Sequence, residues 1–90
     1  MSQAFRAFTG INQVVHEPAR LALLTALSVC ERADFLSFQR LTGLSKGNLS
    51  AHLTKLEGAG LVQIDKHVIG KTPRTSVRLT EEGRTAIEQY

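Results

Sequence analysis

The sequence predicts one small domain of the α+β class, mainly α-helical with a single small β-hairpin. Leucines recur at helical spacing over residues 18–30 and 46–59, as in helices that bury one side. The pattern then changes to an alternation of apolar and polar residues over 61–68 and 76–79, which is typical of half-buried strands. The chain has 90 residues, of which 42% are hydrophobic, so it has room for one core and one domain.

The first predicted helix begins at Pro18, because proline is favoured at the first helical position, where its missing N–H costs nothing. The apolar arc of this helix, from Leu21 to Cys30, is wider than one stripe, which indicates cover on more than one side. A second subunit is one source of that cover. Cys30 is the only cysteine, and we expect it to be a buried, inert thiol.

Residues 1–17 precede this helix as an N-terminal arm. Its apolar side chains belong either to the core or to a dimer contact, and we favour the dimer contact because the other elements already supply a core. The candidate dimer residues, including two from the C-terminal end, are Phe5, Phe8, Val14, Val15, Ile87 and Tyr90.

A second, shorter helix is expected after a strand stub around residues 35–36. Ser37 is a suitable cap for this helix, and Phe38 and Leu41 are expected to point inward. Gly43 suits the left-handed residue that closes a helix. A tight turn is therefore expected directly after this helix.

A third helix is expected over residues 46–59. Leu49, Leu53 and Leu56 follow one another at spacings of four and three, so this helix has one narrow apolar stripe. Two helices joined by a short turn that contains glycine form a helix-turn-helix. The sequence therefore predicts this unit over residues 38–59.

A hairpin is expected next, over residues 61–79, with a long basic loop at 69–75 because glycine and proline occur there. Thr80 then caps a C-terminal helix over 81–90, whose first turn holds two glutamates as the helix dipole favours. A hairpin directly after a helix-turn-helix makes the whole chain, residues 1–90, a winged helix-turn-helix domain.

The positive charge is concentrated in the second half of the chain. There are 11 Lys and Arg against 8 Asp and Glu, a net charge of +3. Residues 45–79 carry a net +4, and residues 66–78 contain four bases and no acid. Such a basic stripe is typical of a surface that binds a polyanion such as nucleic acid. The alternative is a solvated hairpin that happens to be rich in basic residues.

The outward side of the third helix has the chemistry that entry into a DNA groove requires. Its residues are small, hydrogen-bonding or basic, and no acid occurs before Glu57. Small side chains permit a close approach, polar ones reach base edges, and lysine pairs with guanine or phosphate. Gly47 costs about 0.5–1 kcal/mol relative to alanine, which favours a need for close approach over mere tolerance of the turn. The candidate DNA-binding residues here are Ser45, Lys46, Gly47, Asn48, Ser50, Ala51, His52, Thr54 and Lys55.

The hairpin supplies a second set of candidate contacts. Alternation turns Lys66 and Arg78 toward solvent if the apolar residues face the core. Arg74, at the tip of the predicted loop, is the best candidate for the minor groove, and Lys71 for phosphate. The candidate residues of the hairpin are Lys66, Lys71, Thr72, Arg74 and Arg78.

Residues 41–62 (LTGLSKGNLSAHLTKLEGAGLV) resemble the core of MarR/ArsR-type winged-helix transcriptional regulators. Residues 16–21 (HEPARL) resemble the entry to their first core helix, and residues 79–84 (LTEEGR) resemble the exit from their wing. The resemblance covers roughly residues 11–88. It implies a cytoplasmic prokaryotic regulator that binds pseudo-palindromic duplex DNA as a homodimer through its terminal helices. The chain departs from larger members in lacking long terminal helices, and from metal-sensing members in lacking their cysteine-rich pair.

The sequence contains no pattern typical of catalysis or metal binding. His16, His52 and His67 have no ligand spacing, and there is no Gly-rich phosphate loop, His-Glu-x-x-His or nucleophile elbow. No apolar run approaches the roughly 20 residues of a membrane span. We expect no enzyme activity, no cofactor, no metal and no membrane, and no pocket of the usual ligand size, about 300 Å³ or more.

The function expected from the sequence is sequence-specific binding of double-stranded DNA by a homodimeric transcriptional regulator, with repression as its mode. One alternative is a winged-helix protein-interaction module that does not bind DNA. Another is a dimeric sensor with an effector pocket between its subunits, although no residue identifies the effector.

Overall fold

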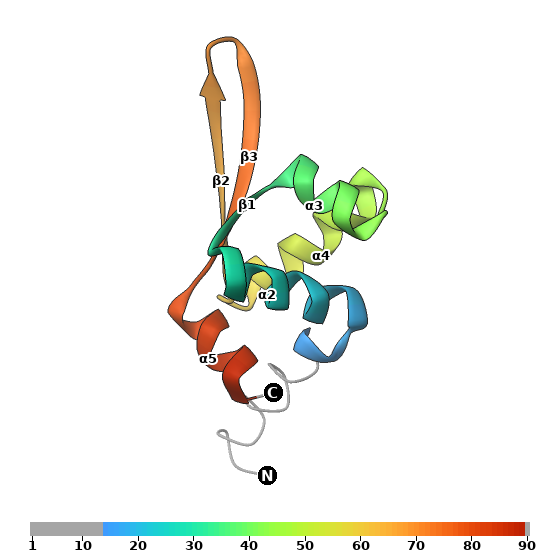
Figure 1. Ribbon diagram of the computed structural model, residues 1–90, viewed down its shortest axis with the longest axis vertical. Coiled ribbons are helices and arrows are strands. Elements are labelled where there is room, and N and C mark those ends of the chain that lie inside the picture. Colours follow the sequence, from blue (N-terminus) through green and yellow to red (C-terminus); the bar gives the residue numbers. More distant parts are fainter. Residues whose placement is uncertain (1–13, 90) are drawn as a thin grey trace.

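The computed structural model describes residues 14–89 and has the winged helix-turn-helix fold predicted from the sequence (Figure 1). The elements, in chain order, are α2 (Pro18–Cys30), β1 (Arg32–Asp34), α3 (Phe35–Thr42), α4 (Lys46–Gly58), β2 (Val62–Ile69), β3 (Thr72–Leu79) and α5 (Glu81–Gln89). None of the helices within these residues is long and apolar enough to cross a membrane.

The sheet is antiparallel with β3 in the middle, in the order β1-β3-β2. The two hairpin strands pair along their whole length, from Val62 opposite Leu79 to Ile69 opposite Thr72. By contrast, β1 pairs only with the three residues Ser76–Arg78 at the base of β3. The hairpin therefore extends well beyond the helices as a two-stranded arm (Figure 1).

The core lies between α2, α4 and the base of the sheet. Leu23, Leu24 and Leu27 of α2 are fully buried, and so are the three leucines of the α4 stripe. Each such side chain stabilises the fold by about 1.5–3 kcal/mol relative to remaining exposed. Because the stripe on α4 is narrow, the remainder of that helix is left outside the core.

The second helix begins earlier than predicted. Asp34 caps it, because its carboxylate accepts a hydrogen bond from the N–H of Leu36 at 3.0 Å. The strand accordingly ends at Asp34, so the predicted strand at residues 35–36 and the Ser37 cap are wrong. Phe38 is buried as predicted, but Leu41 is 69% exposed, because the inward row of this helix runs through Phe35 and Phe38.

The hairpin turn is tight, and the predicted loop at residues 69–75 is wrong. Only Gly70 and Lys71 separate the strands. Gly70 has a φ of +65° and Lys71 has no positive φ, which is the pattern of a two-residue type II′ turn. Pro73 is tolerated inside β3 because β1 has already ended, so the strand has only one neighbour at that point.

Three of the predicted dimer residues pack in or against the core. Val15 is buried, and Val14 packs against the same cluster half-buried, so the prediction that Val15 is a surface contact is wrong. Ile87 also packs against the core while half-buried. The other predicted dimer residues, Phe5, Phe8 and Tyr90, lie outside the described residues.

Helix α5 is attached to the end of α4 by the predicted cap. The hydroxyl of Thr80 accepts a hydrogen bond from the N–H of Gly83 at 2.9 Å and donates one to the carbonyl of Gly60 at 2.6 Å. A Cβ atom on Gly83 would lie 2.0 Å from the carbonyl oxygen of Leu61. Only glycine therefore allows α5 to approach this closely.

Candidate nucleic-acid interface

The outward face of α4 is exposed almost as the sequence predicts. Ser45 caps the helix, with its hydroxyl accepting a hydrogen bond from the N–H of Asn48 at 3.1 Å. An added Cβ atom at Gly47 would meet nothing within 4 Å, so the glycine is not required by packing within the described chain. The exposed residues are Ser45, Lys46, Gly47, Asn48, Ser50, Ala51, Thr54 and Lys55.

His52 is the exception, and its placement on the outward face was wrong. Its side chain is 23% exposed, and Nδ1 lies 3.6 Å from Oε2 of Glu17, the residue that caps α2. His52 is three residues after Leu49 and four before Leu56, so helical geometry brings it next to the buried stripe. Its polar end thus contacts the start of α2 rather than open solvent.

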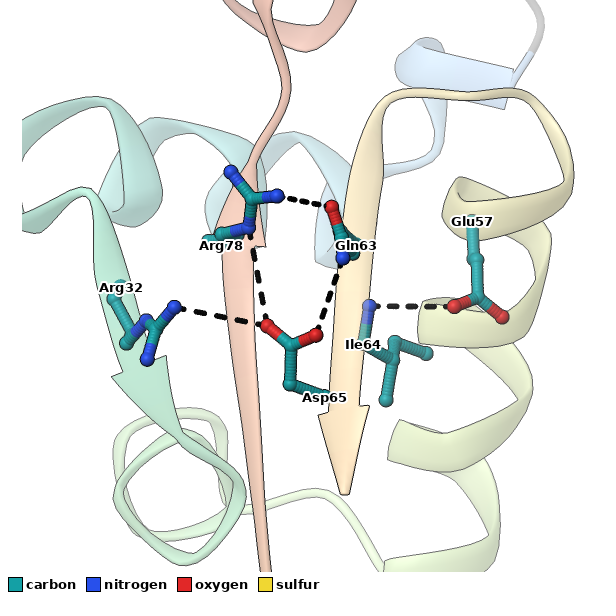
Figure 2. A network of polar contacts seen from close by, with 6 residues as sticks. All are labelled: Arg32, Glu57, Gln63, Ile64, Asp65 and Arg78. Atoms are coloured by element: carbon teal, nitrogen blue, oxygen red, sulfur yellow. Dashed lines mark hydrogen bonds and ion pairs between the residues drawn. The ribbon is translucent and has the colours of Figure 1, made fainter. Parts of the chain in front are cut away.

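The acid on α4 is held away from this face. Oε2 of Glu57 accepts a hydrogen bond from the N–H of Ile64 at 3.2 Å, as Figure 2 shows. Strand β2 is at the edge of the sheet, and Glu57 satisfies one of the backbone donors that such an edge leaves open. The α4 surface from Lys46 to Lys55 therefore remains free of negative charge.

Four lysines around α4 and the hairpin carry uncompensated charge. Within residues 14–89, no ion pair or side-chain hydrogen bond engages them. Lys71 is in the turn at the far end of the hairpin. Lys66 is exposed as predicted, although the register places it on the same face of β2 as Ile64, and solvent reaches it because the hairpin has left the body there. These residues are Lys46, Lys55, Lys66 and Lys71.

The arginine at the base of the hairpin is engaged with acceptors. Nε of Arg78 and Nη2 of Arg32 lie 3.8 and 3.7 Å from Oδ2 of Asp65 (Figure 2). Gln63 donates to Oδ1 of the same carboxylate at 3.2 Å and accepts from Nη2 of Arg78. Exposed pairs of this kind contribute about 0–1 kcal/mol each. Their effect here is to neutralise charge on the outer face of the sheet.

Arg74 does not lie at the hairpin tip, so that prediction was wrong. It is the third residue of β3, opposite His67, and its Nη1 is 4.0 Å from Oδ1 of Asp34. The predicted hairpin contacts thus divide into two groups. Lys66, Lys71 and Thr72 are exposed without an acidic partner, whereas Arg74 and Arg78 lie beside aspartates.

Two apolar residues near the end of the hairpin, Val68 and Ile69, are exposed and were not among the predicted site residues. Adjacent residues on a strand point to opposite faces, so two apolar residues in succession cannot both be buried by one body. The succession of two apolar residues was present in the sequence as a signal of this exposure.

Cys30 is also exposed, contrary to the prediction of a buried thiol. Its Sγ donates a hydrogen bond to the carbonyl of Ala26.

Among residues 14–89, no group of three His, Cys, Asp or Glu side chains is placed to hold a metal ion. The described histidines are therefore not gathered with other ligands into such a site. The candidate interface consists of protein side chains alone: the exposed face of α4 and the far part of the hairpin.

Comparisons with known proteins agree with the winged helix-turn-helix fold described above. Residues 19–90 match the family model described as a winged helix DNA-binding domain. An uncharacterised protein of Methanocaldococcus jannaschii is 40% identical over 70 residues, which are 78% of this chain and 73% of that protein.

Solved structures of regulators have the same fold. A transcriptional regulator homologue from Pyrococcus horikoshii OT3 superposes with a TM-score of 0.81 at 31% identity, over 93% of this chain and 85% of that one. An ArsR-family transcriptional regulator superposes with a TM-score of 0.71 at 26% identity, over 99% of this chain and 87% of that one. A MarR-family protein from Enterococcus faecalis V583 is similar in fold, with a TM-score of 0.81 over 99% of this chain and 79% of that one. The two sequences are 20% identical.

Proposed function

This chain belongs to the winged helix DNA-binding domain family, and from that premise we propose that it is a homodimeric transcriptional repressor that recognises a specific duplex DNA sequence. The observation that carries the proposal is the exposed, acid-free face of α4, with two unpaired lysines on it and two more on the hairpin. A surface with this charge attracts DNA, and the absence of acids spares it the cost of like-charge repulsion.

In the proposed complex, α4 enters the major groove. A helix about 10–12 Å across fits a groove about 12 Å wide. Gly47 and Ala51 let the backbone approach the bases, and Asn48 and Ser50 supply the donors and acceptors that distinguish base pairs. Lys46 and Lys55 pair with guanine or with phosphate at the edges of the groove.

The hairpin contacts the DNA backbone beside that groove. Lys71, in the turn, is the most distant positive charge from the body, and Lys66 is nearer the base of the same arm. Phosphate contacts of this kind fix position and contribute affinity that is independent of sequence. We assign Thr72 a supporting role there as a hydrogen-bond donor to phosphate.

The dimer is proposed to form through the N-terminal arm and α5, with Phe5, Phe8, Ile87 and Tyr90 as its apolar contacts. Two copies related by a two-fold axis recognise two half-sites one turn of DNA apart, about 10 base pairs from centre to centre. Repression follows if such a site overlaps a promoter.

The decisive experiment is an in vitro selection of bound duplexes with full-length protein whose oligomeric state is measured by light scattering. Symmetric half-sites about 10 base pairs apart are expected. Fluorescence anisotropy on the selected duplex is then expected to show affinity falling with salt, with a logarithmic slope of about −3 to −4 per protomer if all four lysines meet phosphate. No binding at physiological salt, or a flat salt response, would instead favour the protein-interaction module.

A further inference from the structure

The outer face of the sheet and α3 border an open groove of about 430 Å³. Its size falls within the range of about 300–1,000 Å³ typical of small-molecule sites, so the expectation that the chain has no pocket of ligand size was wrong. One wall belongs to the hairpin, with His67, Ile69 and Arg74, and the other to α3, with Leu36 and Arg40. The groove is separate from the exposed face of α4, none of whose residues lines it.

The floor of the groove contains a polar atom without a partner. Ser76 is 7% exposed, lies on the outer face of β3 and lines the groove. Within residues 14–89, its Oγ has no hydrogen-bond partner. Buried hydroxyls in folded proteins are nearly always hydrogen-bonded, so this atom offers a donor and an acceptor to a molecule that enters the groove.

The charges around the groove favour an anion. Three arginines line it against one carboxylate, that of Asp34. Asp34 already accepts the N–H of Leu36 and lies 4.0 Å from Arg74, and Arg32 lies beside Asp65. Arg40 is exposed and has no ion pair or side-chain hydrogen bond within residues 14–89. Arginine binds carboxylate and phosphate groups through strong charge-assisted hydrogen bonds.

The two walls also present apolar surface. Leu36 on α3 and Ile69 on the hairpin are both exposed large hydrophobic residues, and both line the groove. An inorganic ion would leave that surface in water, whereas a ligand with a short apolar group would cover it. A duplex backbone would reach the arginines at the rim but would leave the Ser76 hydroxyl without a partner.

We propose that this groove binds a small organic anion, a carboxylate or a phosphate monoester that carries a short apolar group. Arg40 and Arg74 bind the anionic group, Ser76 donates a hydrogen bond to it, and the apolar group packs between Leu36 and Ile69. Because the two walls belong to α3 and the hairpin, the ligand joins these elements. Any effect on DNA affinity rests on the proposed function, but ligand binding itself does not.

The test is isothermal titration of the full chain, without DNA, with hexanoate and hexyl phosphate as probes. Saturable binding of either one supports the proposal, and the tighter of the two identifies the anionic group that the groove prefers. Hexanamide, which is neutral and of the same shape as hexanoate, is expected to bind at least about tenfold more weakly, because a charge-assisted hydrogen bond is lost. Inorganic phosphate is expected to bind more weakly than hexyl phosphate. Equal binding of hexanoate and hexanamide overturns the proposal.

Three variants locate the site. Arg40→Gln is expected to weaken the better probe at least about tenfold. Ser76→Ala is expected to weaken it several-fold while leaving the melting temperature unchanged or raised, because it removes a buried hydroxyl without a partner. Arg84→Gln is the matched control, since it removes the same charge from α5, none of whose residues lines the groove.

Equal affinities of the Arg40→Gln and Arg84→Gln proteins would overturn the proposal. So would a result in which neither probe binds and Arg40→Gln weakens DNA binding instead, because the groove would then be a contact for the DNA backbone. Loss of DNA binding by the unmodified chain, with probe binding intact, would leave the ligand site standing and overturn only the proposed function.

Discussion

The exposed face of α4 and the outer face of the sheet both carry basic side chains, but the two surfaces differ in whether these side chains lie beside acids. Within the described chain, the lysines of α4 and of the hairpin make no ion pair, whereas Arg32, Arg74 and Arg78 lie within 4.0 Å of an aspartate. The planar guanidinium group suits a carboxylate, while the lysine ammonium remains hydrated. A count of positive residues along the hairpin therefore overstates the charge that a polyanion meets there.

The largest expected effect comes from removing two charges from each surface in turn. The double variant Lys46→Gln, Lys55→Gln is expected to lose about 30- to 150-fold in affinity for the selected duplex, because each lysine contact contributes about 1–1.5 kcal/mol. The matched variant Arg32→Gln, Arg78→Gln changes the net charge equally and is expected to lose less than about threefold. Anisotropy titrations at one salt concentration measure both. Equal losses of DNA affinity in the two double variants would show that the charge on the two surfaces contributes equally to binding.

Gly47→Ala sharpens the comparison by separating stability from binding on α4. Nothing lies within 4 Å of the added methyl group, so the helix is expected to gain about 0.5–1 kcal/mol. DNA affinity is expected to fall about tenfold, because the methyl group prevents the closest approach to the bases. Thermal melting and anisotropy measure the two quantities.

Gly58→Ala is the control, since that position is also open but lies at the far end of the helix. It is expected to stabilise the protein by a similar or smaller amount and to leave affinity unchanged. A stabilised Gly47→Ala protein with full affinity would show that the glycine belongs to the turn alone.

Lys71→Ala is a smaller change and affects the hairpin end. Affinity is expected to fall about three- to fivefold for every duplex tested, and the logarithmic salt slope to decrease by about one. Titrations on the selected and on a scrambled duplex at several salt concentrations measure this. A loss confined to the selected duplex would mean that Lys71 contacts a base edge instead.

The smallest effect is expected from Asp65→Asn, which tests the neutralised surface directly. The change releases Arg32 and Arg78 from their carboxylate and is expected to raise affinity for any duplex about two- to threefold at low salt. Unfolding free energy is expected to fall by no more than about 1 kcal/mol. A decrease in affinity would show that the aspartate positions these arginines for DNA rather than withholding them.

The helices and the existence of the hairpin could be predicted because their signals are local. The leucine spacing on α2 and α4 places one side of each helix inward whatever surrounds it, and the alternation at Val62–Asp65 does the same for β2. The start of α3 was missed because Asp34 was not recognised as a cap. The turn was missed because Pro73 suggests a loop unless one knows that β1 has already ended there.

The candidate site was harder, because its charges depend on partners that are distant in sequence. Nothing near Arg74 in the chain indicates that Asp34 will lie beside it, and nothing near His52 indicates that Glu17 will. The position of His52 beside the buried stripe, by contrast, follows from its spacing to Leu49 and Leu56 and could have been predicted. Val15 was misassigned for a similar reason, since its burial depends on how the segment before α2 folds back on the core. Pairings of this kind follow from the tertiary structure and have no local periodicity.

The unequal lengths of β1 and the hairpin have a mechanical consequence. Three strands pair at the base of the hairpin, but the residue pairs from Lys66 opposite Thr75 to Ile69 opposite Thr72 have no backbone pairing with a third strand. A two-stranded ribbon on its own is marginally stable in water, so the outer part of the hairpin is expected to be less stable than its three-stranded base. Amide exchange is therefore expected to quicken steadily toward Gly70. In the proposed complex with DNA, a hairpin end that bends would let the same domain fit duplexes whose grooves differ in width.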